Sequence, residues 1–282
     1  MIIAVRTIRT VAISALLAAG MGTGVARGQP SFDVPFVPTP RVVVDEMLRL
    51  ANVGPNDTVL DLGSGDGRTV IAAARKFGAR AVGVDLDQHL IMQSEESARQ
   101  AGVESRVKFV EQDLFKTDLS RATVITMYLY PEVNRKLRPK LLALRPGTRI
   151  VSHDYDLDDW HPDRISTIRK DVFLWIVPAR VAGRWQMRLA MPPIDRLIEL
   201  EFDQRFQRVS GHATLNGVRA PVWEAKLSGA QIEFVVIDTT DASDEASLYF
   251  QGRVVGDAME GTVTRGVGNS RIVAKWRATQ VN

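Results

Sequence analysis

The chain has 282 residues, 45% of them hydrophobic and 24% charged, which is enough apolar sequence for one or two domains with buried cores and argues against wholesale disorder. The formal net charge is only +3, so the composition gives little support to nucleic-acid binding through a strongly basic surface. Cysteine is absent, which excludes a disulfide framework and thiolate chemistry.

The first 28 residues differ in composition from the rest of the chain. Arg6 and Arg9 precede an apolar stretch over residues 11–25, small residues follow, and no acidic residue occurs before Asp33. This pattern is typical of a secretory signal peptide, with an uncleaved membrane anchor as the alternative. We therefore expect an exported bacterial protein, periplasmic or anchored in the inner membrane, that meets the membrane only through this segment. Without the three arginines of the segment, 33 of the 36 basic residues remain against 33 acidic ones, and no nucleic-acid partner is expected.

Residues 41 to about 155 alternate between amphipathic helices and short apolar strands. The helices are predicted over 41–51, 68–78, 88–102 and 131–144, and the strands over 58–62, 80–86, 106–113, 122–129 and 145–154. Strands that alternate with helices of this length predict a parallel, doubly wound sheet of the Rossmann-like α/β class.

The pattern changes after Asp171, where several short strands are separated by Gly, Asn and Asp turns with no long helix between them. This predicts a mostly antiparallel β domain, closed as a small barrel or packed as a sandwich. We therefore divide the chain into a leader over 1–28, an α/β domain over 29–178 and a β-rich domain over 179–282, although the first one or two strands could instead extend the upstream sheet. The tryptophans of the last domain are expected in its core: Trp185, Trp223 and Trp276.

The stretch VLDLGSGDGRTV, residues 59–70, ends a predicted strand and opens a predicted helix, the place where such sheets bind cofactors. A nucleoside-triphosphate loop is excluded because no Lys follows the glycines. A dinucleotide fingerprint fails too, since Arg68 stands at its third glycine position and Asp66 would repel a pyrophosphate. A nicotinamide-dependent oxidoreductase is therefore disfavoured.

A cationic ligand without phosphates fits this loop better, and S-adenosylmethionine carries a sulfonium, an ammonium and a carboxylate. Gly63 and Gly65 let the backbone approach the methionine part, while Asp61 and Asp66 suit the positive charge. The next strand ends in Asp85, 22 residues beyond Gly63, a spacing at which an acid hydrogen-bonds a ribose diol.

Three motifs in order, each at the end of a predicted strand, resemble the class I, seven-strand methyltransferases: DLGSGDG at 61–67, GVDLD at 83–87 and QDLF at 112–115. In the last motif Asp113 could accept a hydrogen bond from the adenine amino group. The resemblance covers roughly residues 36–160 and implies an S-adenosylmethionine-dependent methyltransferase. The cofactor-binding residues it implies are Asp61, Gly63, Ser64, Gly65, Gly67, Asp85, Leu86, Gln112, Asp113 and Leu114.

A narrower resemblance points to an acceptor. PFVPTP at 35–40 and DLGSGDGR at 61–68 are similar to the lysine methyltransferases that modify the c subunit of ATP synthase and the adenine nucleotide translocase. In that family the first segment caps the cofactor site, which implies that Phe36 and Thr39 flank the ligand. The resemblance also implies a side-chain amine, a protein lysine, as acceptor and thus a protein substrate. The export signal and the β-rich tail depart from the family pattern.

The acceptor side is expected after the fourth and fifth strands. MYLYPEV at 127–133 lacks the Asn/Asp-Pro-Pro-aromatic motif of enzymes that methylate amino groups of bases, and cytosine-C5 methylation needs a Cys that is absent. Tyr128 and Tyr130 either line the acceptor pocket, where aromatic faces attract cations, or pack in the core.

The loop SHDYDLDDWHPD at 152–163 is acidic but does not match a calcium-binding loop. Most of its acids are expected in solvent, and no metal site is predicted. Asp154 lies nearest the strand end, where it could orient or deprotonate an amine.

The leading hypothesis is an S-adenosylmethionine-dependent methyltransferase that acts by in-line transfer, with Asp154, Tyr128 and Tyr130 on the acceptor side. The alternative is an exported, non-catalytic binding module on the same fold, which would suit a protein sent away from the cytoplasmic supply of the cofactor. That alternative predicts a degraded cofactor loop, and the motif is intact.

Overall fold

The structure, a computed structural model, describes residues 36–191, 194–240, 246–266 and 271–281. The predicted leader, residues 1–28, lies outside the described residues. Within the described part of the chain, no helix is both long and apolar enough to cross a membrane.

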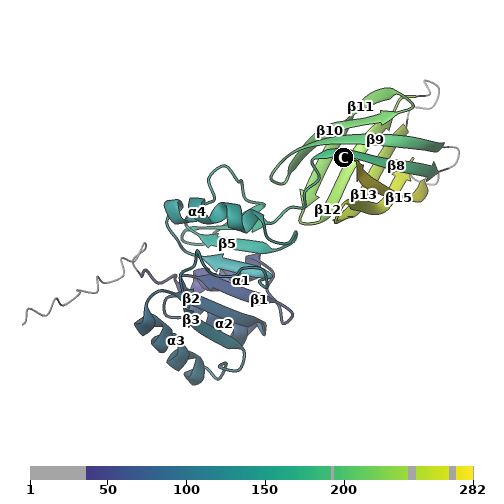
Figure 1. Cartoon of the computed structure of the whole chain (residues 1–282). Coiled ribbons are helices and arrows are strands. Elements are labelled where there is room, and N and C mark those ends of the chain that lie inside the picture. The colour runs from purple at the N-terminus through teal and green to yellow at the C-terminus, as the bar shows by residue number, and fades with distance from the viewer. Residues whose placement is uncertain (1–35, 192–193, 241–245, 267–270, 282) are drawn as a thin grey trace, which may run out of the picture. The chain divides into compact units, whose positions relative to one another are not determined.

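The α/β part is built from four helices and seven strands, drawn in purple to teal in Figure 1. The helices are α1 (Arg41–Leu50), α2 (Arg68–Phe77), α3 (Gln88–Gln100) and α4 (Pro131–Leu142), and the strands are β1 (Thr58–Leu62), β2 (Arg80–Asp85), β3 (Val107–Glu111), β4 (Val124–Met127), β5 (Arg149–His153), β6 (Arg164–Thr167) and β7 (Asp171–Ile176). The strands form one sheet in the order β3-β2-β1-β4-β5-β7-β6. β1 to β5 are parallel, whereas β7 is antiparallel to both β5 and β6.

Side chains alternate between the two faces of the sheet and bury a core on each. Val59 and Val124 pack into one core with α1, α2 and α3, whereas Leu60, Leu62 and Ile125 pack into the other with α4. Burial on both faces explains why β1 and β4 read as nearly continuous apolar runs.

The segment expected to open the β-rich domain forms β7 instead and extends the upstream sheet, the alternative that the sequence left open. Its register pairs His153 with Val172, so the turn before β7 lies beside the end of β5. β6 was not expected, because its four residues are mostly exposed and carry no apolar pattern.

The C-terminal part is a closed antiparallel barrel, drawn in green to yellow in Figure 1. Its strands are β8 (Gly183–Met191), β9 (Ile194–Arg205), β10 (Arg208–Leu215), β11 (Val218–Ser228), β12 (Gln231–Asp238), β13 (Ala246–Val255), β14 (Ala258–Arg265) and β15 (Ile272–Val281). Each strand pairs with its neighbour along the chain, and β15 closes the barrel on β8. Aromatic rings with centroids 4.7 to 6.0 Å apart pack in the interior: Phe202, Phe234, Phe250 and Trp276. The predicted fold class, a Rossmann-like sheet followed by an antiparallel β domain, is confirmed.

The expectation for the barrel tryptophans is wrong for one of the three. Trp185 and Trp276 are buried, but Trp223 is 52% exposed. Ala220 faces the interior, so alternation along β11 turns Trp223 outward. The strand is also irregular between Trp223 and Lys226, with Glu224 at a φ of +50°, and neither feature can be read from the composition of the segment.

Candidate active site

The glycine loop connects β1 to α2 and needs its glycines. Gly63, Gly65 and Gly67 have φ values of +74°, +53° and +75°, the left-handed region that side chains rarely adopt. The N–H groups of Gly63 and Ser64 both donate to the carbonyl oxygen of Val84 at 2.9 Å. The loop is therefore tied to the end of β2.

The carboxylate of Asp85, at the end of β2, binds the backbone of the glycine loop. Its Oδ2 accepts a hydrogen bond from the N–H of Gly65 at 2.9 Å, and its Oδ1 accepts one from the N–H of Asp87 at 3.0 Å. Leu86, the next residue, is 39% exposed at the same edge. The carboxylate thus has a fixed orientation at the carboxyl edge of the sheet, where its predicted ribose contact would be made.

Asp61 is a buried carboxyl at the end of β1. Its Oδ1 accepts a hydrogen bond from the hydroxyl of Thr126 at 2.6 Å. Burial, aided by the negative charges of Asp85 and Asp66, raises the pKa of Asp61 to about 7 against the opposing hydrogen bonds of Thr126 and Thr69. A cationic ligand beside it would favour the ionised form.

The segment around Phe36 and Thr39 packs onto the loop. A Cβ atom on Gly65 would come within 2.3 Å of the Phe36 ring, so this ring lies directly over the loop. Arg68 Nη1 donates to the carbonyl oxygen of Thr39 at 2.8 Å, which fastens the segment to the start of α2. Phe36 and Thr39 therefore lie at the cofactor loop, and their contact with the ligand stays a prediction.

Asp66 does not offer a free charge to a ligand, contrary to expectation. Its carboxylate accepts several hydrogen bonds from Arg68, the shortest from Nε to Oδ1 at 2.8 Å and from Nη2 to Oδ2 at 2.5 Å. Although burial alone would raise it, this pair leaves the pKa of Asp66 below its usual value. Asp66 instead neutralises the arginine that anchors the covering segment.

The motif after β3 is brought to the same edge. The N–H of Gln112 donates to the carbonyl oxygen of Asp85 at 2.8 Å. Asp113 Oδ1 accepts from the N–H of Phe115 at 2.8 Å, so this acid also stabilises its own turn. Leu114 packs against the core on the α4 side. The adenine contact of Asp113 stays a prediction.

These residues fit S-adenosylmethionine. The hydroxyl of Ser64 is buried and has no hydrogen-bond partner among the described residues, which leaves a donor inside the loop for a ligand. Asp61 would hold the ammonium of the cofactor, Asp85 its ribose, and the glycine backbone its methionine part. When bound, the cofactor supplies a methyl group on a positively charged sulfur.

The acceptor side gathers aromatic side chains at the ends of β4 and β5. The Tyr128 ring lies 4.2 Å from the His153 ring and 6.0 Å from the Tyr155 ring, and Tyr130 lies 5.8 Å from Tyr155. Tyr128 is half-buried and Tyr130 is 37% exposed, so both lie at the surface of this edge rather than in the core. The side chain of Asp154 pairs here with Lys170, Oδ2 to Nζ at 3.2 Å.

His153 and Tyr155 were missed from the sequence. His153 is 2% exposed, its Nδ1 lies 3.3 Å from the Thr39 hydroxyl, and its Nε2 has no partner within the described residues. Burial, together with nearby Lys170, lowers the pKa of His153 despite the opposing charge of Asp154. The position of His153 in the sequence could have indicated it, because His153 ends β5 and directly precedes the predicted site residue Asp154.

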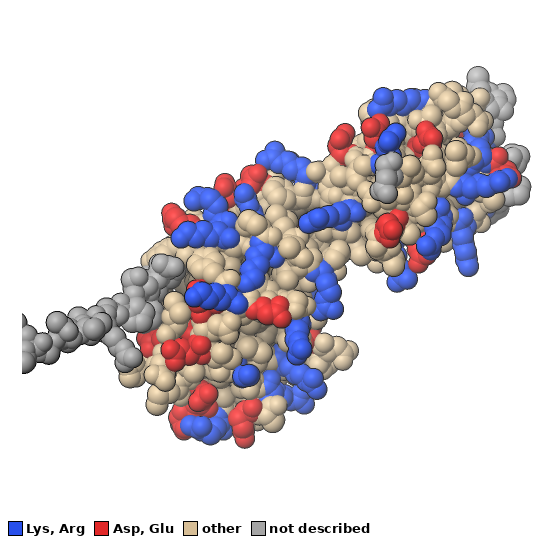
Figure 2. All heavy atoms as spheres, in the orientation of Figure 1, with Lys and Arg blue, Asp and Glu red and all other residues tan. Residues whose placement is uncertain are grey.

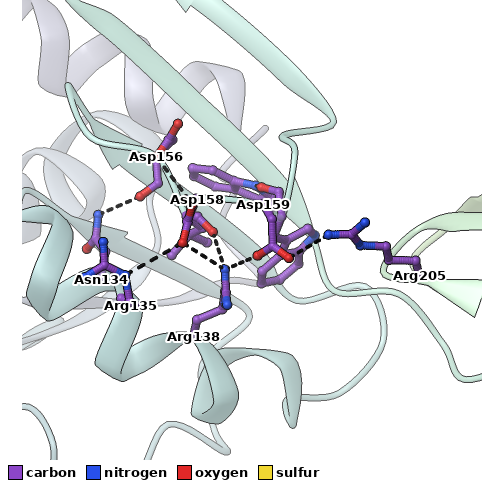
Figure 3. A network of polar contacts seen from close by, with 10 residues as sticks. Asn134, Arg135, Arg138, Asp156, Asp158, Asp159 and Arg205 are labelled. Atoms are coloured by element: carbon purple, nitrogen blue, oxygen red, sulfur yellow. Dashed lines mark hydrogen bonds and ion pairs between the residues drawn. The ribbon is translucent and has the colours of Figure 1, made fainter.

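Asp158 and Asp159, farther along this loop, are exposed to solvent as expected and also pair with arginines. Arg138 pairs with both Asp158 and Asp159, and Asp159 also pairs with Arg205 at 2.9 Å (Figure 3). Trp160 is buried beneath the loop and donates to Gln207 Oε1 at 3.0 Å. Among the residues that the structure describes, no three His, Asp or Glu side chains are placed to hold a metal ion.

Comparisons with known proteins point to one family. The model of the ANTKMT methyltransferase domain matches residues 61–164. The chain is 40% identical over 151 residues to a protein-lysine N-methyltransferase of Saccharolobus islandicus (strain REY15A), an alignment that covers 51% of this chain and 94% of that protein. It is 35% identical over 130 residues to the adenine nucleotide translocase lysine N-methyltransferase of Mus musculus, an alignment that covers 46% of this chain and only 56% of that protein.

A solved structure agrees with this assignment. An RNA methyltransferase from Salinibacter ruber, in complex with S-adenosyl-L-homocysteine, is 51% identical with a TM-score of 0.50, over 51% of this chain and 96% of that chain. The matches to the Saccharolobus and Salinibacter proteins, together with the seven-stranded sheet and its glycine loop, show that this chain belongs to the class I S-adenosylmethionine-dependent methyltransferases.

Proposed function

We propose that this methyltransferase modifies the ε-amino group of lysine in a protein substrate. The observation that carries the proposal is the ion pair between Asp154 and Lys170, because it holds an alkylammonium group at a carboxylate whose neighbours in the chain, His153 and Tyr155, pack against Tyr128. These residues follow β4 and β5, whose carboxyl ends share an edge with the cofactor loop. The acceptor side thus accommodates a lysine side chain.

The roles of the residues follow from their positions. Asp154 attracts and orients the incoming ammonium, and the tyrosine rings add cation–π attraction. Phe36 covers the loop and limits the access of water. Most of the rate enhancement would come from positioning the two reactants in a dry site, without a covalent intermediate.

Two other acceptor or function classes have less support. An RNA acceptor is suggested by the name of the Salinibacter protein, but Asp154 would repel phosphates, and basic and acidic side chains are interspersed on the face in Figure 2. A non-catalytic binding module would not need the loop geometry, yet the glycines and Asp85 keep it.

We also propose that the chain is exported or held at the inner membrane by its first 28 residues, on the leader pattern alone. Cell fractionation and N-terminal sequencing of the expressed full chain test this. A shortened chain in the periplasm supports export, and an intact chain in the membrane fraction supports an anchor that leaves the enzyme on the cytoplasmic side. An intact chain in the cytoplasm contradicts both.

The acceptor class is tested by incubating a bacterial proteome extract and total RNA with methyl-labelled S-adenosylmethionine and the full chain. Hydrolysis followed by chromatography separates methylated lysine from methylated nucleosides. We expect label in methyl-lysine with the wild type, and about tenfold less with Asp154→Asn, since a charge-assisted contact is lost. Asp45→Asn is the matched control, because it removes a similar lysine pair between α1 and α2 that includes none of the acceptor residues. Label confined to nucleosides would overturn the lysine proposal.

A further inference from the structure

Lys170 is brought to the acceptor side by the register of the sheet. It precedes β7, which runs antiparallel to β5 and pairs Val172 with His153. The N–H of Asp154 donates to the carbonyl oxygen of Asp171 at 2.7 Å, one residue from Lys170. The turn before β7 therefore delivers the lysine side chain to the carboxylate of Asp154.

The side chains of Asp154 and Lys170 differ in how far they are exposed to solvent. The Asp154 side chain is 18% exposed and its backbone has a φ of +65°, a conformation that costs energy for a non-glycine residue and often occurs at functional sites. The Lys170 side chain is 61% exposed. The backbone therefore holds the Asp154 carboxylate in place. The exposed ammonium of Lys170 can dissociate from it and bind again, since exposed ion pairs are weak.

The chain has a second lysine–aspartate pair with nearly the same exposure. Lys76 Nζ lies 2.7 Å from Asp45, with side chains 53% and 27% exposed, between α2 and α1. This pair includes no residue of the acceptor side, where Tyr128, His153 and Tyr155 pack together. It provides an internal control for what an ion pair alone does to a lysine.

We propose that Lys170 is a methyl acceptor of this enzyme, modified within the same molecule. The inference rests on the proposed function and identifies the first lysine that its acceptor site receives. The ammonium of Lys170 first loses a proton to water, which its exposure allows. Nζ then uses its lone pair to form the new N–C bond with the methyl carbon, the C–S bond breaks, and the sulfur keeps the electron pair in the product S-adenosylhomocysteine.

The test is peptide mapping by mass spectrometry after the full chain is incubated with methyl-labelled S-adenosylmethionine. We expect label on the peptide containing Lys170 and none on that containing Lys76. The fraction of modified chain at a given time should not change on dilution, because the reaction is intramolecular. Asp154→Asn should slow the labelling about tenfold through the lost charge-assisted contact, while Asp45→Asn should leave it unchanged.

A second readout needs no cofactor. The hydrogen bond and charge of Asp154 raise the pKa of Lys170, so an amine-acylating reagent should modify Lys170 slowly in the cofactor-free protein. Asp154→Asn should speed this acylation several-fold. An unchanged rate would show that the pair does not form in solution and would overturn the inference.

The outcomes separate this inference from the proposed function. If lysines of the proteome extract are methylated while Lys170 stays unmodified, the inference is wrong and the proposed function stands. Labelling that falls on dilution would mean transfer between molecules and would also overturn it. If only nucleosides carry label, the proposed function itself fails and the inference fails with it.

Discussion

The side chains of Thr39 and His153 meet although 114 residues separate them, with the hydroxyl oxygen 3.3 Å from Nδ1. Thr39 belongs to the segment that covers the cofactor loop, and His153 packs against Tyr128 on the acceptor side. This contact joins the two halves of the active site. Closure over the cofactor and shaping of the acceptor pocket are therefore expected to depend on each other.

Substitution of His153 tests this connection. His153→Ala removes the ring beneath Tyr128, so we expect the KM for a lysine substrate to rise about tenfold with a smaller change in cofactor affinity. Thr39→Val deletes only the hydroxyl and should change both quantities by less. Steady-state kinetics and calorimetry measure the split, and a loss confined to cofactor binding would argue against a positioning role for His153.

Asp61 makes cofactor binding depend on pH. Its pKa of about 7 in the free protein means that a cation binds better as the carboxyl ionises, so affinity should rise between about pH 6 and 8. Asp61→Asn should bind more weakly and lose the part of the pH dependence due to this group. Calorimetric titrations of the wild type and of Asp61→Asn with the cofactor across this pH range test the prediction. The same pH dependence in both proteins would contradict the role of Asp61 in cofactor binding.

Ionisation of Asp61 strengthens cofactor binding but lowers the stability of the cofactor-free protein. In the unfolded chain Asp61 loses its proton near pH 4, but burial keeps the proton on the folded, cofactor-free protein up to about pH 7. Between about pH 4 and pH 7 the folded state therefore binds more protons at Asp61 than the unfolded chain does, so the contribution of Asp61 to the free energy of unfolding falls as pH rises. Chemical denaturation at pH 5 and pH 8 should show Asp61→Asn gaining stability relative to wild type at the higher pH.

Gly65→Ala tests the covering segment. The new Cβ would overlap the Phe36 ring, and the positive φ adds about 1–2 kcal/mol of strain. We expect at least about tenfold weaker cofactor binding. Gly54→Ala is the matched control, since nothing lies within 4 Å of its Cβ position. Equal cofactor affinities of Gly65→Ala and Gly54→Ala would contradict the placement of Phe36 over the cofactor loop.

Two tryptophans of the barrel give a stability test. Trp276→Ala should lower the free energy of unfolding by about 3–5 kcal/mol, because the ring is buried and its Nε1 donates to the carbonyl oxygen of Thr262. Trp223→Ala should change it by about 0.5 kcal/mol or less. Denaturant titrations check both values, and a large loss for Trp223→Ala would contradict its outward orientation.

The parallel half of the sheet could be predicted because β1 and β4 are buried apolar runs and because β1, β2 and β4 are each followed by a helix. The glycine loop could be predicted for a different reason: alternate glycines mark a backbone that only glycine adopts, as the φ values of Gly63 and Gly65 bear out. Local patterns of this kind depend on neighbouring residues alone.

The remaining features depend on contacts between distant residues. The pairing of β7 with β5, the neutralisation of Asp66 by Arg68 and the meeting of Lys170 with Asp154 arise from strand register and side-chain direction. The sequence of a short strand such as β7 gives no sign of its register, and this is why the acceptor side was predicted only in outline.

The most direct measurement is a calorimetric titration of the full chain with S-adenosylmethionine, with Asp85→Ala as the comparison. Asp85 holds the loop through Gly65 and lies where the ribose contact is expected, so we expect saturable binding by the wild type and its loss in the folded variant. Absence of binding to the folded wild type would contradict the assignment of this edge as a cofactor site and move the function toward a non-catalytic binding module.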